Sequence, residues 1–167
     1  EKATRRFLDQ GNPVYLTQDW HPADHVSFYT NNPGTEPMQV IEIDGRPQVM
    51  WPPHCVQNTS GAEILITTEN LAKTVQKGMD QRFDSYSGYK DDGGGETGLN
   101  DMLQQDGIKN LIIFGLATDY CVKATVLDAR DAGYQVELLL SLCRGVNPET
   151  TKDAIEEMKA KGVIVSE

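Results

Sequence analysis

The sequence predicts an α/β fold in which helices cover both faces of a doubly wound, mostly parallel β-sheet. From residue 97 onward, short apolar runs alternate with segments of helical periodicity, which is the pattern of a parallel sheet buried on both sides. The predicted strands there are apolar throughout rather than alternating with polar residues. The length of 167 residues favours a single domain that spans residues 1–167.

The first half of the chain contains many residues that interrupt regular structure. Residues 1–10 are typical of the end of a helix, stopped by a Gly-Asn-Pro sequence, and a strand is predicted over 14–17. Prolines and glycines recur through 22–60, which predicts a long loop with at most short strands, and loops of that length usually have a function. Another strand is predicted over 73–77, and the glycines at 93–95 indicate a loop tip.

The second half alternates regularly between helices and strands. Thr97 is a candidate N-cap, and Val122, Val126 and Ala129 are spaced to form one inward helix face. Ligands of such sheets bind beyond the carboxyl ends of the strands, so residues at those ends are the candidates for chemistry. The predicted elements are a helix at 97–106, a strand at 111–116, a helix at 119–132, a strand at 136–140, a helix at 149–161 and a strand at 163–165.

Composition excludes several classes of partner. Fifteen basic residues against 25 acidic ones give a net charge of −10, which argues against binding to nucleic acid or to an anionic membrane surface. No apolar run approaches the roughly 18 residues of a membrane span, and residues 1–10 have no signal-peptide core. Three cysteines cannot all pair within one chain, which favours a reducing, cytoplasmic setting. We expect a small-molecule substrate, and the sequence leaves a homo-oligomer open.

All three histidines of the chain lie in two short polar segments. His21 and His25 follow the predicted strand at 14–17, and His54 follows a Trp-Pro-Pro sequence. Asp19 and His21 are two residues apart at a strand end, so their side chains leave the same face. A carboxylate with imidazoles suits one divalent metal ion, with zinc as first candidate and iron or manganese as alternatives. Ordinary loop histidines are the alternative, and His25 is open between a third ligand and a supporting residue.

Cys121 follows the predicted strand at 111–116 and opens the next helix. The positive end of the helix dipole there favours a thiolate, and the N–H groups of the turn can stabilise an oxyanion. A buried structural cysteine is an equally open alternative for Cys121, and packing is the favoured role of Cys55 and Cys143.

One lysine and three aromatic residues are further candidates for the functional site. Lys77 ends the strand at 73–77, where it could hold a carboxylate, favour the thiolate or lie in solvent. Trp20, Trp51 and Tyr86 could wall a pocket for a flat ring or belong to the core and its rim.

Together these motifs resemble the nicotinamidase/pyrazinamidase group of the isochorismatase-like hydrolases. The motifs are Asp-Trp-His-Pro-x-x-His-x-Ser-Phe, Trp-Pro-Pro-His-Cys, Lys-Gly and Gly-x-Ala-Thr-Asp-Tyr-Cys-Val, in that order, and the resemblance runs from about Val14 to the end of the chain. The first two motifs are the specific ones. The last would also fit other cysteine amidohydrolases.

The resemblance implies a role for each matching residue. Asp19, His21 and His54 match the metal ligands of the group, and His25 matches an additional ligand in some members. Lys77 matches the catalytic lysine and Cys121 the nucleophile. The backbone N–H groups of Ala117 and Cys121 match the oxyanion hole, and the bond between Leu116 and Ala117 is implied to be cis. Trp51 and Tyr86 match aromatic walls of the substrate pocket.

The implied reaction is the hydrolysis of nicotinamide to nicotinate and ammonia in NAD salvage. The metal would hold the pyridine nitrogen, and Cys121 would form a thioester that water hydrolyses.

The sequence departs from the family in one respect. The family opens with a strand that ends in Asp-x-Gln-x-Asp-Phe, whose first Asp is the acid/base partner of the cysteine, and residues 1–167 contain no such segment. We therefore expect the domain to be N-terminally incomplete here, or the chain to be a truncated relative. Two other functions stay open: a cysteine amidase acting on a carbamoyl or ureido compound, and a catalytically inactive metal-binding or ligand-binding remnant.

Overall fold

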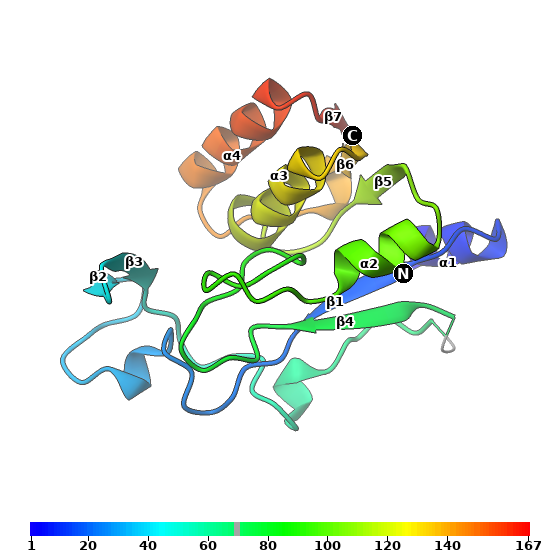
Figure 1. The fold of residues 1–167 in the computed structure, drawn as a ribbon. Coiled ribbons are helices and arrows are strands. Elements are labelled where there is room, and N and C mark those ends of the chain that lie inside the picture. Colours follow the sequence, from blue (N-terminus) through cyan, green and yellow to red (C-terminus); the bar gives the residue numbers. More distant parts are fainter. Residues whose placement is uncertain (69–70) are drawn as a thin grey trace. The chain divides into compact units, whose positions relative to one another are not determined.

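Parallel strand pairing organises both halves of the chain in the structure, a computed structural model that describes residues 1–68 and 71–167 (Figure 1). The chain divides into two compact units, residues 1–84 and 85–167. Among the described residues, no helix combines the length and the apolar character needed to cross a membrane. One domain over 1–167 stays a prediction.

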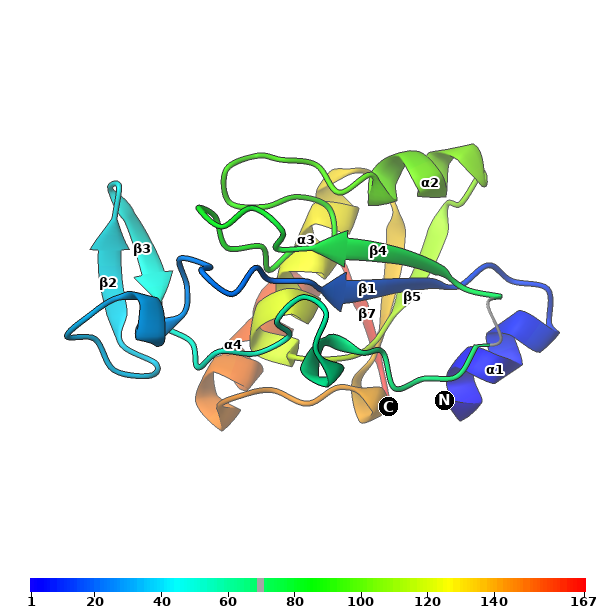
Figure 2. The ribbon, with the colours of Figure 1, turned by 90° about the horizontal axis from the view of Figure 1, so that it is seen from below.

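Unit 1 is built around two parallel strands and a hairpin. Its helices and strands are α1 (Lys2–Asp9), β1 (Tyr15–Asp19), β2 (Val40–Ile43), β3 (Arg46–Val49) and β4 (Lys73–Lys77). β1 and β4 pair in parallel, in a register that sets Asp19 opposite Lys77. β2 and β3 form an antiparallel hairpin beyond the carboxyl ends of β1 and β4 (Figure 2). The hairpin accounts for the short strands expected within 22–60.

Unit 2 contains the regular alternation of strands and helices. Its elements are α2 (Leu99–Gln105), β5 (Asn110–Ile113), a π-helical turn (Thr118–Val122), α3 (Lys123–Asp131), β6 (Gln135–Leu139), α4 (Pro148–Ala160) and β7 (Ile164–Ser166). The strands are parallel in the order β5, β6, β7.

The core of unit 2 follows the two periodicities of its sequence. Val136 and Leu138 point inward from alternate positions of β6 and are buried. The helices bury residues three or four apart, which include the predicted inward face of the helix after residue 119. The buried apolar helix side chains of unit 2 are Leu99, Leu103, Val122, Val126, Ala129, Ala154 and Met158.

The predicted elements are present, with four local corrections. The strand predicted over 14–17 runs from Tyr15 to Asp19. The strand predicted over 111–116 ends at Ile113. The helix predicted over 119–132 begins as the π-helical turn and becomes α-helical at Lys123. The helix predicted from residue 97 begins at Leu99 with Gly98 as N-cap, because Gly98 adopts a left-handed conformation (φ 86°). Thr97 still contributes, since its Oγ1 accepts the Leu99 N–H at 3.2 Å.

Candidate functional site

An ion pair joins the carboxyl ends of β1 and β4 in unit 1. Asp19 and Lys77 are the last residues of the two strands and lie opposite each other in the parallel register. Lys77 Nζ is 2.5 Å from Asp19 Oδ1, and the lysine is only 4% exposed. A buried ammonium requires such a partner. Of the alternatives open for Lys77, the structure therefore shows it holding a carboxylate.

Backbone pairing brings the segment of His54 beside that of His21. His21 forms a parallel bridge with Val56, donating its N–H to Cys55 O at 3.0 Å and accepting the Gln57 N–H at 2.8 Å. The rings of His21 and His54 then lie 5.0 Å apart, centroid to centroid. One ligand atom from each of Asp19, His21 and His54 can be chosen so that all three lie within 4.8 Å of one another.

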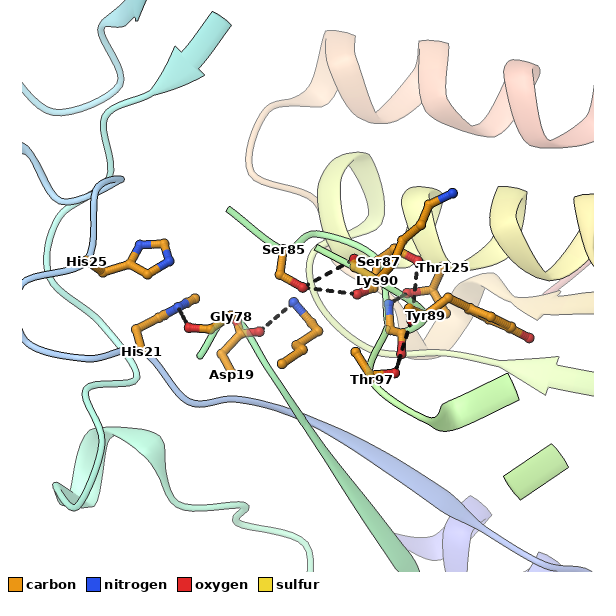
Figure 3. A network of polar contacts seen from close by, with 12 residues as sticks. Asp19, His21, His25, Gly78, Ser85, Ser87, Tyr89, Lys90, Thr97 and Thr125 are labelled. Atoms are coloured by element: carbon orange, nitrogen blue, oxygen red, sulfur yellow. Dashed lines mark hydrogen bonds and ion pairs between the residues drawn. The ribbon is translucent and has the colours of Figure 1, made fainter. Parts of the chain in front are cut away.

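The ring nitrogens of both histidines are oriented by backbone carbonyls. His21 Nδ1 lies 2.9 Å from Gly78 O, and His54 Nδ1 lies 2.8 Å from Pro52 O. A carbonyl only accepts, so Nδ1 carries the proton in each ring and the Nε2 lone pair remains for a ligand. Figure 3 shows His21 directed at Gly78.

Electrostatics keep His21 in the form that a metal requires. Burial lowers the pKa of His21 to about 4, and the neighbouring His25 and His54 add to this, while Asp19 and the Gly78 carbonyl oppose it. The imidazole is therefore neutral near pH 7. With one carboxylate and two imidazoles, the donor set fits a divalent metal ion.

His25 lies next to this group but uses both of its ring nitrogens elsewhere. Its side chain is fully buried, and burial lowers its pKa. Nε2–H donates to Phe83 O at 3.1 Å, and Nδ1 accepts the Ser27 N–H at 3.3 Å. The His25 ring is 4.5 Å from that of His21. His25 is not a member of the group of three possible ligands.

Two residues near the histidines have no role in the sequence-based prediction. Gly78 has a φ of +66°, and a Cβ on it would lie 2.5 Å from His21 Nδ1. Two signals pointed to Gly78: its position directly after a strand end and its place in the Lys-Gly motif. Phe28 is fully buried, and its ring lies 5.6–5.7 Å from each of the three imidazoles. The contact between Phe28 and the three imidazoles could be seen only in the folded structure.

Trp51 adjoins the histidines from the end of the hairpin. It pairs with Phe28 in a parallel bridge, and its ring lies 6.2 Å from that of His54. Trp20 donates its backbone N–H to Lys77 O, which extends the pairing of β1 with β4. Cys55 is half-buried, and burial raises the pKa of its thiol.

Unit 2 carries Cys121 in the π-helical turn that follows β5. The peptide bond between Leu116 and Ala117 is cis, as expected. The carbonyl of Ala117 accepts the N–H groups of Tyr120 at 3.1 Å and Val122 at 3.0 Å, which folds the chain tightly around a half-buried Cys121. Cys121 is thus the fourth residue of the helical run rather than the third, because the turn already begins at residue 118.

Unit 2 also contains Cys143, Tyr86 and Asp119, and the contacts of Asp119 were not predicted from the sequence. Cys143 is 3% exposed, and burial raises its pKa, which fits the expected packing role. Tyr86 lies with its ring 5.4 Å from that of Tyr120. Asp119 lies within the cysteine motif without a predicted role, yet its buried carboxylate accepts three hydrogen bonds from the segment before and within α4.

The isochorismatase domain family matches residues 1–167. The chain is 46% identical over 158 residues to the nicotinamidase of Escherichia coli (strain K12), in an alignment that covers 92% of this chain and 74% of that protein. It is 37% identical to the nicotinamidase of Acinetobacter baylyi, with 90% and 72% covered.

Solved structures show the same likeness. The pyrazinamidase of Pyrococcus horikoshii in complex with zinc superposes with a TM-score of 0.83 at 36% identity, covering 99% of this chain and 81% of that one. The yeast nicotinamidase bound to the inhibitor nicotinaldehyde gives a TM-score of 0.90 at 28% identity, covering 99% and 86%. The predicted α/β fold class is confirmed by these likenesses.

Proposed function

We propose that this chain, which belongs to the isochorismatase family and is similar to the nicotinamidases of Escherichia coli and Acinetobacter baylyi, hydrolyses nicotinamide to nicotinate and ammonia. The observation that carries this proposal is the group of Asp19, His21 and His54, with both imidazoles oriented to present Nε2. Such a set suits a ligand with an aromatic nitrogen better than it suits a carbamoyl compound without one.

Asp19, His21 and His54 would hold one divalent metal ion, and zinc is the proposed ion because a relative from Pyrococcus horikoshii binds it. When bound, the ion supplies a Lewis acid for the ring nitrogen of the substrate. His25 is proposed as a support for His21 rather than a ligand, because its lone pair is used by the Ser27 N–H.

Cys121 is the proposed nucleophile. Its sulfur forms a bond to the amide carbon, and the C–N bond breaks as the nitrogen takes up a proton and leaves as ammonia. Water then adds to the thioester, the C–S bond breaks, and nicotinate and the thiol are released. The backbone N–H groups of Ala117 and Cys121 are the proposed donors to the oxyanion of both steps.

Lys77 and the aromatic residues have proposed supporting roles. Lys77 balances the charge of Asp19 at 2.5 Å. Trp51 and Tyr86 are proposed as walls for the pyridine ring, each within its own unit. The small neutral substrate and the odd number of cysteines support a cytoplasmic enzyme.

Ammonia release from nicotinamide by the full-length protein tests the proposal. We expect activity that a chelator removes and zinc restores. Cys121→Ser should abolish ammonia release while leaving the metal content unchanged. Cys143→Ala is the matched control and should stay active, since this buried thiol has a structural role and donates to Leu139 O at 3.3 Å. A Cys121→Ser variant as active as wild type would refute the mechanism.

A further inference from the structure

Asp119 is a buried carboxylate two residues before Cys121. It is 5% exposed, and both of its oxygens accept hydrogen bonds. Oδ1 accepts the Val146 N–H at 2.9 Å, while Oδ2 accepts the Asn147 N–H at 3.2 Å and the Thr150 hydroxyl at 2.5 Å. Burial alone would raise the pKa of Asp119, but the hydrogen bonds from Thr150, Val146 and Asn147 hold it below its ordinary value.

These bonds join the cysteine turn to the segment that leads into α4. A backbone link accompanies them, because Thr118 donates its N–H to Arg144 O at 3.0 Å and Leu116 forms a parallel bridge with Arg144. The residues that precede Cys121 in the turn are thus attached to residues 144–150. Asp119 is the side chain that makes this attachment within the turn itself.

The start of α4 has a cap of its own besides its contacts with Asp119. Asn147 is its N-cap, and the side chain of Asn147 accepts the Glu149 N–H at 2.8 Å. Two of the donors to Asp119, the N–H groups of Val146 and Asn147, lie outside the helix. The third donor, Thr150, lies in the first turn of α4, so Asp119 links the turn of Cys121 both to the segment before the helix and to the helix itself.

Asp119 can hold the turn without placing its charge against the thiol. Residues two apart on a helical turn point to different sides, so the carboxylate faces α4 while Cys121 is presented elsewhere. Asp119 is accordingly buried, whereas Cys121 is half-buried.

We propose that Asp119, together with Thr150, is a positioning residue that sets the orientation of the turn carrying Cys121. This inference rests on the proposed function, in which the thiol and the N–H of Cys121 act on the substrate. A small displacement of a nucleophile lowers turnover strongly, by as much as about 100-fold for about 1 Å.

Three variants of the full-length enzyme test the proposal. Asp119→Asn replaces the charge, Thr150→Val removes one donor but keeps both backbone bonds, and Thr150→Ser keeps the hydroxyl. For the first two we expect kcat to fall by about tenfold or more with KM changed less than about threefold. Thr150→Ser should keep the kcat of the wild type. The rate of Cys121 alkylation by iodoacetamide in the folded enzyme should change in the first two variants only.

Asp131→Asn is the matched control. Asp131 pairs with Lys161 at 3.3 Å, so it also joins the end of α3 to the residue after α4, but away from the turn. It should leave kcat and the alkylation rate unchanged. Unaltered kcat and alkylation in a folded Thr150→Val variant would overturn the proposal.

The alkylation readout separates this inference from the proposed function. If wild type released no ammonia from nicotinamide, the proposed function would fail, and alkylation of Cys121 would still report on Asp119. If wild type is active and the variants keep both readouts, only the positioning role is wrong. An Asp119→Asn variant that does not fold leaves Thr150→Val to decide.

Discussion

Gly78 occupies a position where both the backbone and a neighbouring imidazole exclude a side chain. Its φ is +66°, and a Cβ would lie 2.5 Å from the His21 Nδ1 that Gly78 O binds. We expect Gly78→Ala to displace the ring and weaken metal binding by about 10–100-fold, which is typical when a residue that orients a ligand is changed. Competition with a chromogenic chelator measures this affinity.

Gly34→Ala is the control for backbone strain alone. Gly34 has a φ of +86°, but no atom lies within 4 Å of a Cβ placed there. It should lose about 1 kcal/mol of stability and keep its metal affinity. Equal loss of affinity in both variants would show that the contact with His21 is unimportant.

Protonation of His21 should make the metal-free protein acid-sensitive. Burial lowers its pKa to about 4, so between pH 6.5 and 4 the unfolded chain binds a proton at His21 that the folded chain does not. As far as His21 is concerned, the free energy of unfolding is therefore highest above pH 6.5 and falls as the pH drops toward 4. For His21 alone we expect a loss of about 2 kcal/mol between pH 7 and pH 5, measured by urea unfolding with chelator present.

His21→Asn separates this contribution from other titrating groups. Its amide N–H₂ can still donate to Gly78 O, but it does not titrate. The variant should lose less stability than wild type over the same interval. An identical loss in both proteins would mean that His21 does not control the acid sensitivity.

The residues of the candidate site were predictable only where the sequence alone determines their placement. Asp19 and His21 share a strand end, so their proximity follows from strand geometry. The carbonyls that orient the imidazoles, from Gly78 and Pro52, carry no signal in the side-chain sequence. Asp119 was invisible for a related reason, because its three donors lie 27 to 31 residues away.

At the scale of elements, apolar periodicity predicted strands and helices well. β4 has the predicted bounds, since Val75 and Lys77 alternate inward. The π-helical turn before α3 was not distinguished from an α-helix, because Val122 continues the helical spacing of Val126 and Ala129. The hairpin of β2 and β3 was predicted only as short strands, because Pro47 lies within β3 and obscured the signal of its Asp44-Gly45 turn, in which both residues have positive φ.

The N-cap of α4 should be worth a measurable part of the stability. Asn147 Oδ1 accepts the Glu149 N–H at 2.8 Å, and Pro148 occupies the first helical position, where its missing N–H is not needed. We expect Asn147→Ala to lower the free energy of unfolding by about 1 kcal/mol. Asn147→Asp should restore it, since a carboxylate also caps. Urea unfolding decides, and a neutral alanine variant would contradict this assignment.

At the scale of the molecule, the enzyme class came from the order of several motifs. A single histidine could equally be an ordinary loop residue, and a single cysteine could equally be structural, so neither alone would have indicated a nicotinamidase. The match to the isochorismatase family, together with the 46% identity between this chain and the nicotinamidase of Escherichia coli, confirms the family that those motifs indicated. The net charge of −10 fits a small-molecule enzyme and excluded nucleic acid as the expected partner.

Metal removal should show whether residues 1–167 unfold as the one domain that their length predicts. The proposed ligands Asp19, His21 and His54 all lie in unit 1. A metal that binds only the native state adds about 2.7 kcal/mol at 100 times its Kd. If both units unfold together, chelation should lower amide-exchange protection about 100-fold in β4 and in β6 alike, because RT ln 101 applies to every amide exposed by global unfolding.

Hydrogen exchange followed by mass spectrometry, with and without chelator, resolves the two units. His54→Ala is the control, since it should no longer respond to the chelator. The comparison is made at the slowest-exchanging amides, because loops near the metal open locally whatever the cooperativity. Loss of protection confined to residues 1–84 would refute the single-domain prediction. It would show that metal binding stabilises unit 1 without being coupled to the unit that carries Cys121.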